Sequence, residues 1–281
     1  MRHKGMGRAL TLLLVLYSSA HQSAAAQCPD GSSPPCRSGR VASAPPPNSV
    51  AVLYFDNLSR DAGDAYLADG LTEEVIVHLG QVRRLAVTSR SAVRRFRGGA
   101  ESPAALGRVL GVAYIVSGAV RPAGRRLRVT AELVRTGSGT RVWGDVFDRS
   151  SADLFAIQAE IAEAVATAIA GQLIPDERAR LSARPTRDPE AYDLYLRGQF
   201  FLARFTEADI HRAIALYSQA ITRDSTFAIA FAATAVAWNA LADDWLPPLE
   251  SYPKARVAAE RALALDTSAT ALAGLFWPIM Q

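Results

Sequence analysis

A buried strand, a short polar turn and an amphipathic helix follow one another between Ser49 and Glu74, and this stretch constrains the fold more than any other. Residues 50–55 (VAVLYF) are all apolar, and a short apolar run before turn residues is typical of a strand buried on both faces. The helix is predicted to begin near Asp64, with an apolar stripe at Leu67, Leu71, Val75 and Leu79. Strand, turn and helix make half of a βαβ unit, so we expect an α/β domain.

The chain up to residue 175 extends this unit. We expect a second parallel strand at 85–89 and a helix that begins at Pro103 and ends at Gly111. Three strands should follow at 113–121, 126–134 and 141–147, the first two joined by the turn Pro122-Ala123-Gly124. Apolar and polar residues alternate along the middle strand, which predicts one buried and one solvated face. A helix from Asp153 to Leu173, ended by Pro175, completes the order βαβαβββα over residues 48–175.

The first 26 residues are typical of a secretory signal peptide. Arg2, Lys4 and Arg8 precede a run of twelve apolar or small residues, and Ala24 to Ala26 offer a cleavage site. Twelve helical residues span about 18 Å, less than the roughly 30 Å of a bilayer core. We therefore predict a cleaved signal peptide rather than a membrane anchor, and a periplasmic or envelope-associated protein.

Cys28 and Cys36 follow the predicted cleavage site within a Cys- and Pro-rich linker, residues 27–47. An exported chain meets oxidising conditions, so we expect these two cysteines to form a small disulfide loop. A lipid anchor on Cys28 is the alternative. It is disfavoured by Gln27, where lipoprotein signals place a small residue.

The net charge gives no support for nucleic-acid binding. The signal peptide carries three basic residues and no acid, so its removal lowers the formal net charge from +4 to +1. Residues 27–150 carry 17 basic and 11 acidic residues, whereas residues 151–281 carry 11 and 16. The opposite net charges of the two halves favour either attraction between the halves or the binding of separate partners by each half.

Residues 190–281, after an expected linker at 176–189, are rich in alanine and predicted to be helical. Small residues and aromatic residues recur at helical spacing, with Ala213, Tyr217 and Ala220 followed by Ala255, Ala259 and Ala262. The pattern resembles tetratricopeptide repeats lengthened by the loop at 246–248. That resemblance implies an all-α repeat domain that binds protein partners. The partner contacts we expect are Tyr195, Phe201, Arg204 and Asn239.

The repeat array is short. About three repeats normally bury a continuous core, and the sequence stops at Gln281 within a third. The apolar tail would then dock as a cap, pair with another chain, or show that the sequence is a fragment. Ser225 and Thr267 also stand where the family usually has proline.

Several segments of residues 48–175 resemble, in order, the TolB N-terminal-like (FlgO-like) domain of bacterial envelope and signalling proteins. They are VAVLYFDNLS, YLADGLTEEV, LAVTSR, ALGRVLGVAYIVSGAVR, LRVTAELV, VWGDVFDR and FAIQAEIAEAVA. The resemblance implies a small extracytoplasmic α/β module, often placed before helical repeats and often fused to kinase, cyclase or winged-helix segments. The family has no agreed catalytic residues, so none is transferred to this chain.

The sequence offers little for catalysis. Beyond the signal peptide it has two histidines, His78 and His211, and none of the CxxC, HExxH, GxSxG or phosphate-loop patterns. We predict no enzyme activity, no cofactor and no metal site. The acids near the end of the first strand, Asp56, Asp69, Glu73 and Glu74, are interpreted as turn and helix residues, with a cation or acid/base site as the alternative.

Four arginines, Arg90, Arg94, Arg95 and Arg97, surround Phe96 and form the most distinctive expected surface feature. They are interpreted either as a patch for an anionic envelope component or an acidic protein, or as a solvated edge that balances the acidic half.

These observations predict a non-enzymatic exported adaptor that binds protein partners through its helical repeats. The alternative is the extracytoplasmic sensory or regulatory module of a kinase- or cyclase-linked signalling system that lacks its catalytic part.

Overall fold

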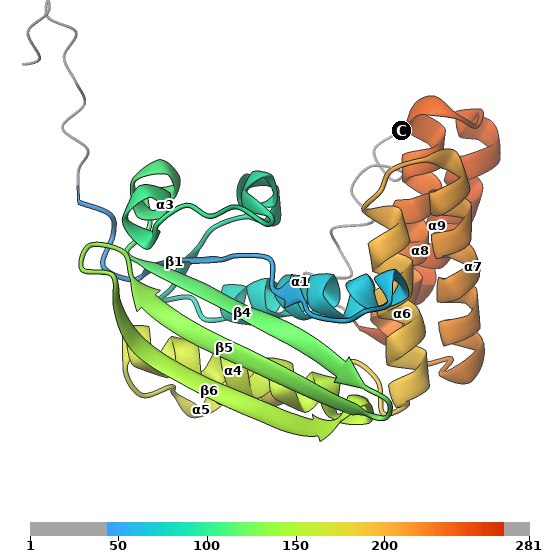
Figure 1. Cartoon of the computed structure of the whole chain (residues 1–281). Helices are drawn as coiled ribbons and strands as arrows, with labels where there is room; N and C mark the ends of the chain where they lie inside the picture. Colours follow the sequence, from blue (N-terminus) through green and yellow to red (C-terminus); the bar gives the residue numbers. More distant parts are fainter. Residues whose placement is uncertain (1–43, 267–281) are drawn as a thin grey trace, which may run out of the picture. The chain divides into compact units, whose positions relative to one another are not determined.

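The computed structural model describes residues 44–266, which form a mixed β-sheet with helices on both faces, followed by a run of four consecutive helices (Figure 1). The predicted signal peptide, the expected Cys28–Cys36 disulfide and the apolar tail from residue 267 lie outside the described residues. No helix within residues 44–266 is both long and apolar enough to cross a membrane.

The sheet combines parallel and antiparallel strands in the order β3-β1-β4-β5-β6, and β2 pairs with β4. The strands are β1 (Ser49–Val52), β2 (Asp56–Asn57), β3 (Ala86–Val87), β4 (Tyr114–Ala123), β5 (Arg126–Arg135) and β6 (Thr140–Ser150). β1 is parallel to both neighbours, β3 and β4, whereas β4, β5 and β6 form an antiparallel meander. The predicted parallel pairing of the first two strands is thus confirmed.

β1 is buried on both faces, as the sequence predicts. Val50 and Val52 belong to the main hydrophobic core, whereas Ala51 packs in a smaller cluster with Val93 and Leu106. Side chains of a strand alternate between faces, so β1 contacts both layers of helices. The strand ends at Val52 rather than near Phe55, because the Phe55 N–H donates to Thr72 Oγ1 (2.9 Å) instead of to a neighbouring strand.

Helices cover the sheet on both faces (Figure 1). α1 (Ala65–Gly80) and α4 (Leu154–Ala170) pack on the face that holds the main core, and α2 (Arg90–Val93) and α3 (Pro103–Leu110) pack on the other. α3 begins with proline after the Ser102 cap and ends at Gly111, which adopts φ +67°. Proline at the first turn and a left-handed glycine after the last are favourable helix ends, so this prediction is confirmed.

The meander has the predicted alternation. Leu127, Val129 and Leu133 are fully buried, whereas Arg126 and Arg128 are exposed on the other face. The strands are longer than expected, since Pro122 and Ala123 still pair with β5. Only Gly124 and Arg125 remain for the turn, and Gly124 adopts φ +61°, a conformation that favours glycine.

The chain around residue 175 differs from the prediction. α4 ends at Ala170, not Leu173, and Pro175 begins a further helix, α5 (Pro175–Ser182), inside the segment expected to be a linker. Glu177 explains this helix, because its Oε2 accepts from the Ile174 N–H (3.1 Å) and pairs with Arg84 Nη2 (2.7 Å). A long-range ion pair and a local cap together stabilise a helix that the polar local sequence only weakly favours.

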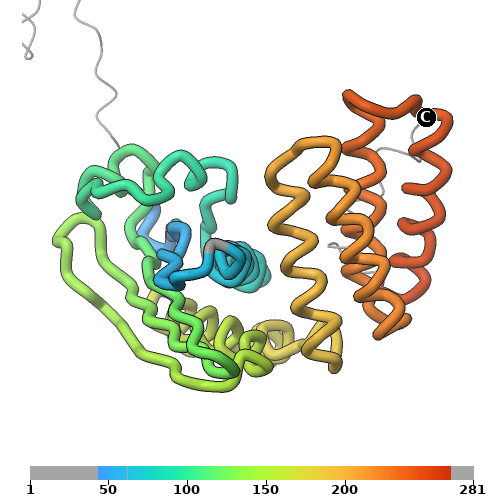
Figure 2. The backbone as a smooth tube through the Cα atoms, turned by 45° about the vertical axis from the view of Figure 1, so that its right-hand side comes forward, coloured from blue at the N-terminus to red at the C-terminus, as the bar shows by residue number. Residues whose placement is uncertain are grey.

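The last part of the described chain, residues 189–265, is helical, as predicted. We call it the helical part and residues 49–182 the α/β part. Its helices are α6 (Pro189–Leu202), α7 (Glu207–Arg223), α8 (Ala228–Asp244) and α9 (Pro248–Leu265). Consecutive helices lie side by side in both views (Figures 1 and 2). The recurring small residues are buried between them, as their spacing indicated.

Gly198 shows why a small residue is needed where α6 crosses α7. A Cβ atom at this position would lie 2.3 Å from the Tyr217 ring, which is fully buried. The absence of a side chain therefore sets the separation of the two helices.

Replacing Gly198 with alanine should destabilise the protein by about 1–3 kcal/mol, because a methyl group overlaps the Tyr217 ring. Chemical denaturation of the variant measures this loss. Gly80→Ala is the matched control, since a Cβ there meets nothing within 4 Å and should leave stability unchanged or slightly higher. Equal stability of the two variants would contradict the close packing at Gly198.

Candidate functional site

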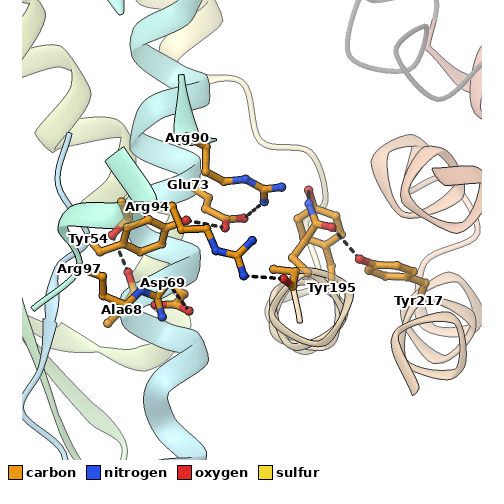
Figure 3. Close-up of polar contacts among 12 residues, drawn as sticks. Tyr54, Ala68, Asp69, Glu73, Arg90, Arg94, Arg97, Tyr195 and Tyr217 are labelled. Atoms are coloured by element: carbon orange, nitrogen blue, oxygen red, sulfur yellow. Dashed lines mark hydrogen bonds and ion pairs between the residues drawn. The ribbon is translucent and has the colours of Figure 1, made fainter. Parts of the chain in front are cut away.

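The four arginines singled out in the sequence lie on α2, on the short 3₁₀ helix η2 (Arg94–Phe96) and, for Arg97, directly after it. They have different partners, and Figure 3 shows those of Arg90, Arg94 and Arg97. Arg90 pairs with Glu73 (2.8 Å), and Arg97 pairs with Asp69 (2.9 Å). The Arg95 guanidinium lies over the Phe96 ring, 4.7 Å from its centroid. The predicted patch is therefore divided, with two arginines paired to acids of α1.

Within the described residues Arg94 forms no ion pair and lies over no aromatic ring, although its positive charge, like that of Arg97, favours the ionised form of the nearby Asp69 carboxyl. Its Nη2 donates to the carbonyl oxygen of Ala203 (3.0 Å), at the C-terminal end of α6. Among residues 44–266, no carboxylate forms an ion pair with Arg94. Because a guanidinium has five N–H donors, most of the hydrogen-bonding capacity of Arg94 is free within the described part of the chain.

The acids of α1 face two directions. Asp69 and Glu73, one helical turn apart, lie toward the arginines, and Tyr54 donates a long hydrogen bond to Glu73 (3.4 Å). Burial raises the pKa of both carboxyls, and the adjacent Arg97 and Arg90 oppose this. The described residues include no cluster of acids, cysteines and histidines that could hold a metal ion, so these acids do not converge on a cation site.

Glu74 points the other way, into the contact between α1 and α6. It is buried, and desolvation together with the charge of Glu73 raises its pKa to about 7. The nearby hydroxyl groups of Tyr195 and Tyr192 partly offset this rise. Tyr192 in turn donates to Gln158 Oε1 of α4 (2.6 Å). A carboxyl that titrates near neutrality therefore joins α1, α4 and α6.

A groove of about 390 Å³ lies beside Arg94, between α6 and α8; we call it the α6–α8 groove. Its lining consists of one stripe from α6, one stripe from α8, a loop phenylalanine and two arginines: Tyr195, Gln199, Leu202, Ala203, Phe205, Ile229, Ala232, Ala233, Val236, Ala240, Arg90 and Arg94. Along each helix the lining residues are three or four positions apart, except for the adjacent pairs Leu202–Ala203 and Ala232–Ala233, so they share one helix face. The groove is thus mainly apolar with a cationic margin.

Hydrogen bonds hold the polar part of the groove in place. Tyr217 Oη donates to Gln199 Oε1 (2.6 Å), and Gln199 Nε2 donates to Tyr195 Oη (3.0 Å), as Figure 3 shows in part. Two large apolar side chains remain exposed in the lining, Phe205 at 49% and Val236 at 39%. Phe205 also adopts φ +52°, which is uncommon for a residue with a side chain.

Of the four partner contacts expected from the sequence, the structure places only Tyr195 in the lining of this groove. Phe201 lies under the Arg212 guanidinium of α7 (4.1 Å), and Arg204 pairs with Asp209 (3.2 Å). Asn239 lies on α8 outside the lining. The sequence analysis did not identify Phe205 or Val236. The only sequence signal for Phe205 is that it is a large apolar residue in a turn, and the only signal for Val236 is that it is an aliphatic residue among alanines.

The two histidines have separate surroundings. His78 is buried beside the Phe155 ring (5.6 Å), and desolvation lowers its pKa although its ring also hydrogen-bonds the Leu181 backbone. His211 faces the Trp238 ring (6.3 Å). Neither lines the α6–α8 groove.

No family model matches the chain. A curated relative from Rhizobium meliloti (strain 1021), named "Putative adenylate cyclase 3", is 33% identical over 201 residues. The match covers 70% of this chain and 34% of the relative, so the chain spans about a third of that protein's length.

Three solved structures give partial matches. Lipoprotein GNA1162 from Neisseria meningitidis has a TM-score of 0.32 at 18% identity, over 37% of this chain and 80% of its own. TolB from Acinetobacter baumannii has a TM-score of 0.34 at 17% identity, over 46% of this chain and 30% of its own. The LpoB C-terminal domain from Salmonella enterica has a TM-score of 0.31 at 14% identity, over 37% and 82%. All three TM-scores lie below 0.5, so no conclusion about this chain follows from them.

Glu74 should make stability depend on pH. Its pKa in the folded state, about 7, exceeds its ordinary value of 4.5, so the folded protein binds more protons than the unfolded chain between these values. Stability therefore falls as pH rises from 4.5 to 7, by up to about 3 kcal/mol.

Glu74→Gln removes this titration. The stability of the variant minus that of the unsubstituted protein should therefore be higher at pH 8 than at pH 5. Denaturation at both pH values measures the difference. Glu101→Gln, at an exposed position, is the control and should show no such trend. A pH-independent effect of Glu74→Gln would contradict the raised pKa.

Proposed function

We propose that this chain is a non-enzymatic interaction protein that binds a segment of a partner protein in the α6–α8 groove. The observation that carries the proposal is that Phe205 and Val236 are exposed beside Arg94 within the α6–α8 groove. Apolar side chains left open to solvent in a concave surface are typical of binding sites.

The helical part supports this proposal if its four helices are two tetratricopeptide-like pairs, α6 with α7 and α8 with α9. The close contact of Gly198 with Tyr217 and the buried alanines at the other crossings fit such pairs. The groove would then lie along the first helix of each pair, and stacked helix pairs present extended concave surfaces to their partners. An extended segment fits this shape.

Site-specific cross-linking in the native cells tests the proposal. A photoreactive amino acid at Val236 should give a covalent product with one defined protein, because this side chain is exposed in the groove. The matched control is Val257, which is 67% exposed on α9 outside the groove and should not capture that protein. Capture of the same proteins at both positions, or at neither, would contradict groove binding.

A second candidate is a regulatory module of a cyclase-linked signalling system, which is favoured by the name of the Rhizobium meliloti relative. The chain would then correspond to about a third of such a protein and regulate its catalytic part. We propose that the adaptor is exported after cleavage at Ala26, whereas the regulatory module keeps its N-terminal segment as an anchor.

Two measurements separate these candidates. Mass spectrometry of the chain purified from its native cells should find Gln27 at the N-terminus if it is an exported adaptor, and deletion of the gene should leave cyclic AMP unchanged. An uncleaved N-terminus together with altered cyclic AMP would reject the adaptor in favour of the regulatory module.

A further inference from the structure

We infer that the partner segment carries an acidic side chain flanked by apolar ones, and that Arg94 of the α/β part binds its carboxylate within the α6–α8 groove. This inference rests on the proposed function, which it deepens by naming the chemistry of the partner. The α/β part then selects the ligand for a groove whose apolar walls belong to the helical part.

The ion pairs around the groove leave Arg94 without a carboxylate in direct contact among residues 44–266, because the nearby Asp69, which both arginines influence, is paired with Arg97. Arg90 also lines the groove, but its charge is balanced by Glu73. Arg97 is matched by Asp69 in the same way and does not line it. Arg94 alone both lines the groove and lacks an ion pair within residues 44–266. One unmatched guanidinium is complementary to one carboxylate.

The position of Arg94 favours a strong ion pair with the carboxylate of the partner segment. Its hydrogen bond to the Ala203 carbonyl fixes one end of the guanidinium and leaves the other donors available. Arg94 itself is exposed, but Leu202 and Phe205, the neighbours of that turn, also line the groove and place apolar side chains on one side of the site. An ion pair beside apolar walls is screened less than one in open solvent.

The length of the apolar wall favours a peptide segment over a small carboxylate. The α8 residues of the lining run from Ile229 to Ala240, about 16 Å along the helix axis. An extended chain covers this distance with about five residues at roughly 3.3 Å each. A lone carboxylate would leave Val236 and most of this wall uncovered.

A phage-displayed heptapeptide library, selected on the purified chain, tests the inference. Peptides fused through their C-termini offer carboxylates only from side chains, and we expect enrichment of one Asp or Glu among apolar residues. Arg94→Gln should lose this preference, whereas Arg95→Gln, on the same turn but outside the groove, should keep it. Apolar peptides without an acid would overturn the inference but support the proposed function. No enrichment at all would contradict both.

Fluorescence anisotropy with the best selected peptide gives the magnitude. Arg94→Gln should weaken binding about ten- to a hundredfold, the usual effect of losing a charge-assisted hydrogen bond. Arg94→Glu should bind the peptide whose acid is replaced by lysine more tightly than the original peptide. This rescue separates recognition from a purely structural role of Arg94, and its absence would overturn the inference. Displacement of the peptide by free N-acetylglutamate at similar concentration would also overturn it, in favour of a small-carboxylate site.

Discussion

Helix α1 packs against the sheet on one side and against α6 on the other, and the rest of the described structure depends on this double contact. Leu71, Val75 and Leu79 are fully buried in the main core. On the other side, a Cβ atom at Gly70 would lie 3.1 Å from Leu196 Cδ2 of α6, so the Leu196 side chain would have to shift by a few tenths of an ångström to admit a larger residue. One hydrophobic core therefore extends from the sheet to α8, and the α/β and helical parts are not independent.

The same helix sets the charges around the groove. α1 places Asp69 and Glu73 toward the arginines and Glu74 toward α6. The first two acids are compensated by guanidinium groups, whereas burial favours the neutral form of Glu74. The acids on one helix thereby determine which arginine remains available to a ligand.

Local pattern was sufficient for most of the fold because strands and helices depend on neighbours a few residues away. The buried first strand, the helix after it, the Pro103–Gly111 helix and the alternating meander all follow from short-range spacing. The predicted ends of strands and helices were wrong where a residue distant in the sequence binds the backbone or a side chain. Thr72 takes the Phe55 N–H, and Arg84 pairs with Glu177 of α5 from 93 residues away.

The sequence by itself determined that a strand-and-helix layer precedes a helical region, and that arginines gather after the second strand. Only the tertiary structure decided which of those arginines are paired, that Phe205 and Val236 share a hollow, and that the two regions have one core. The physical reason is the range of the contacts. Periodicity reflects a residue's own helix or strand, whereas Arg94 and Ala203 are 109 residues apart in the sequence and meet only in the tertiary structure.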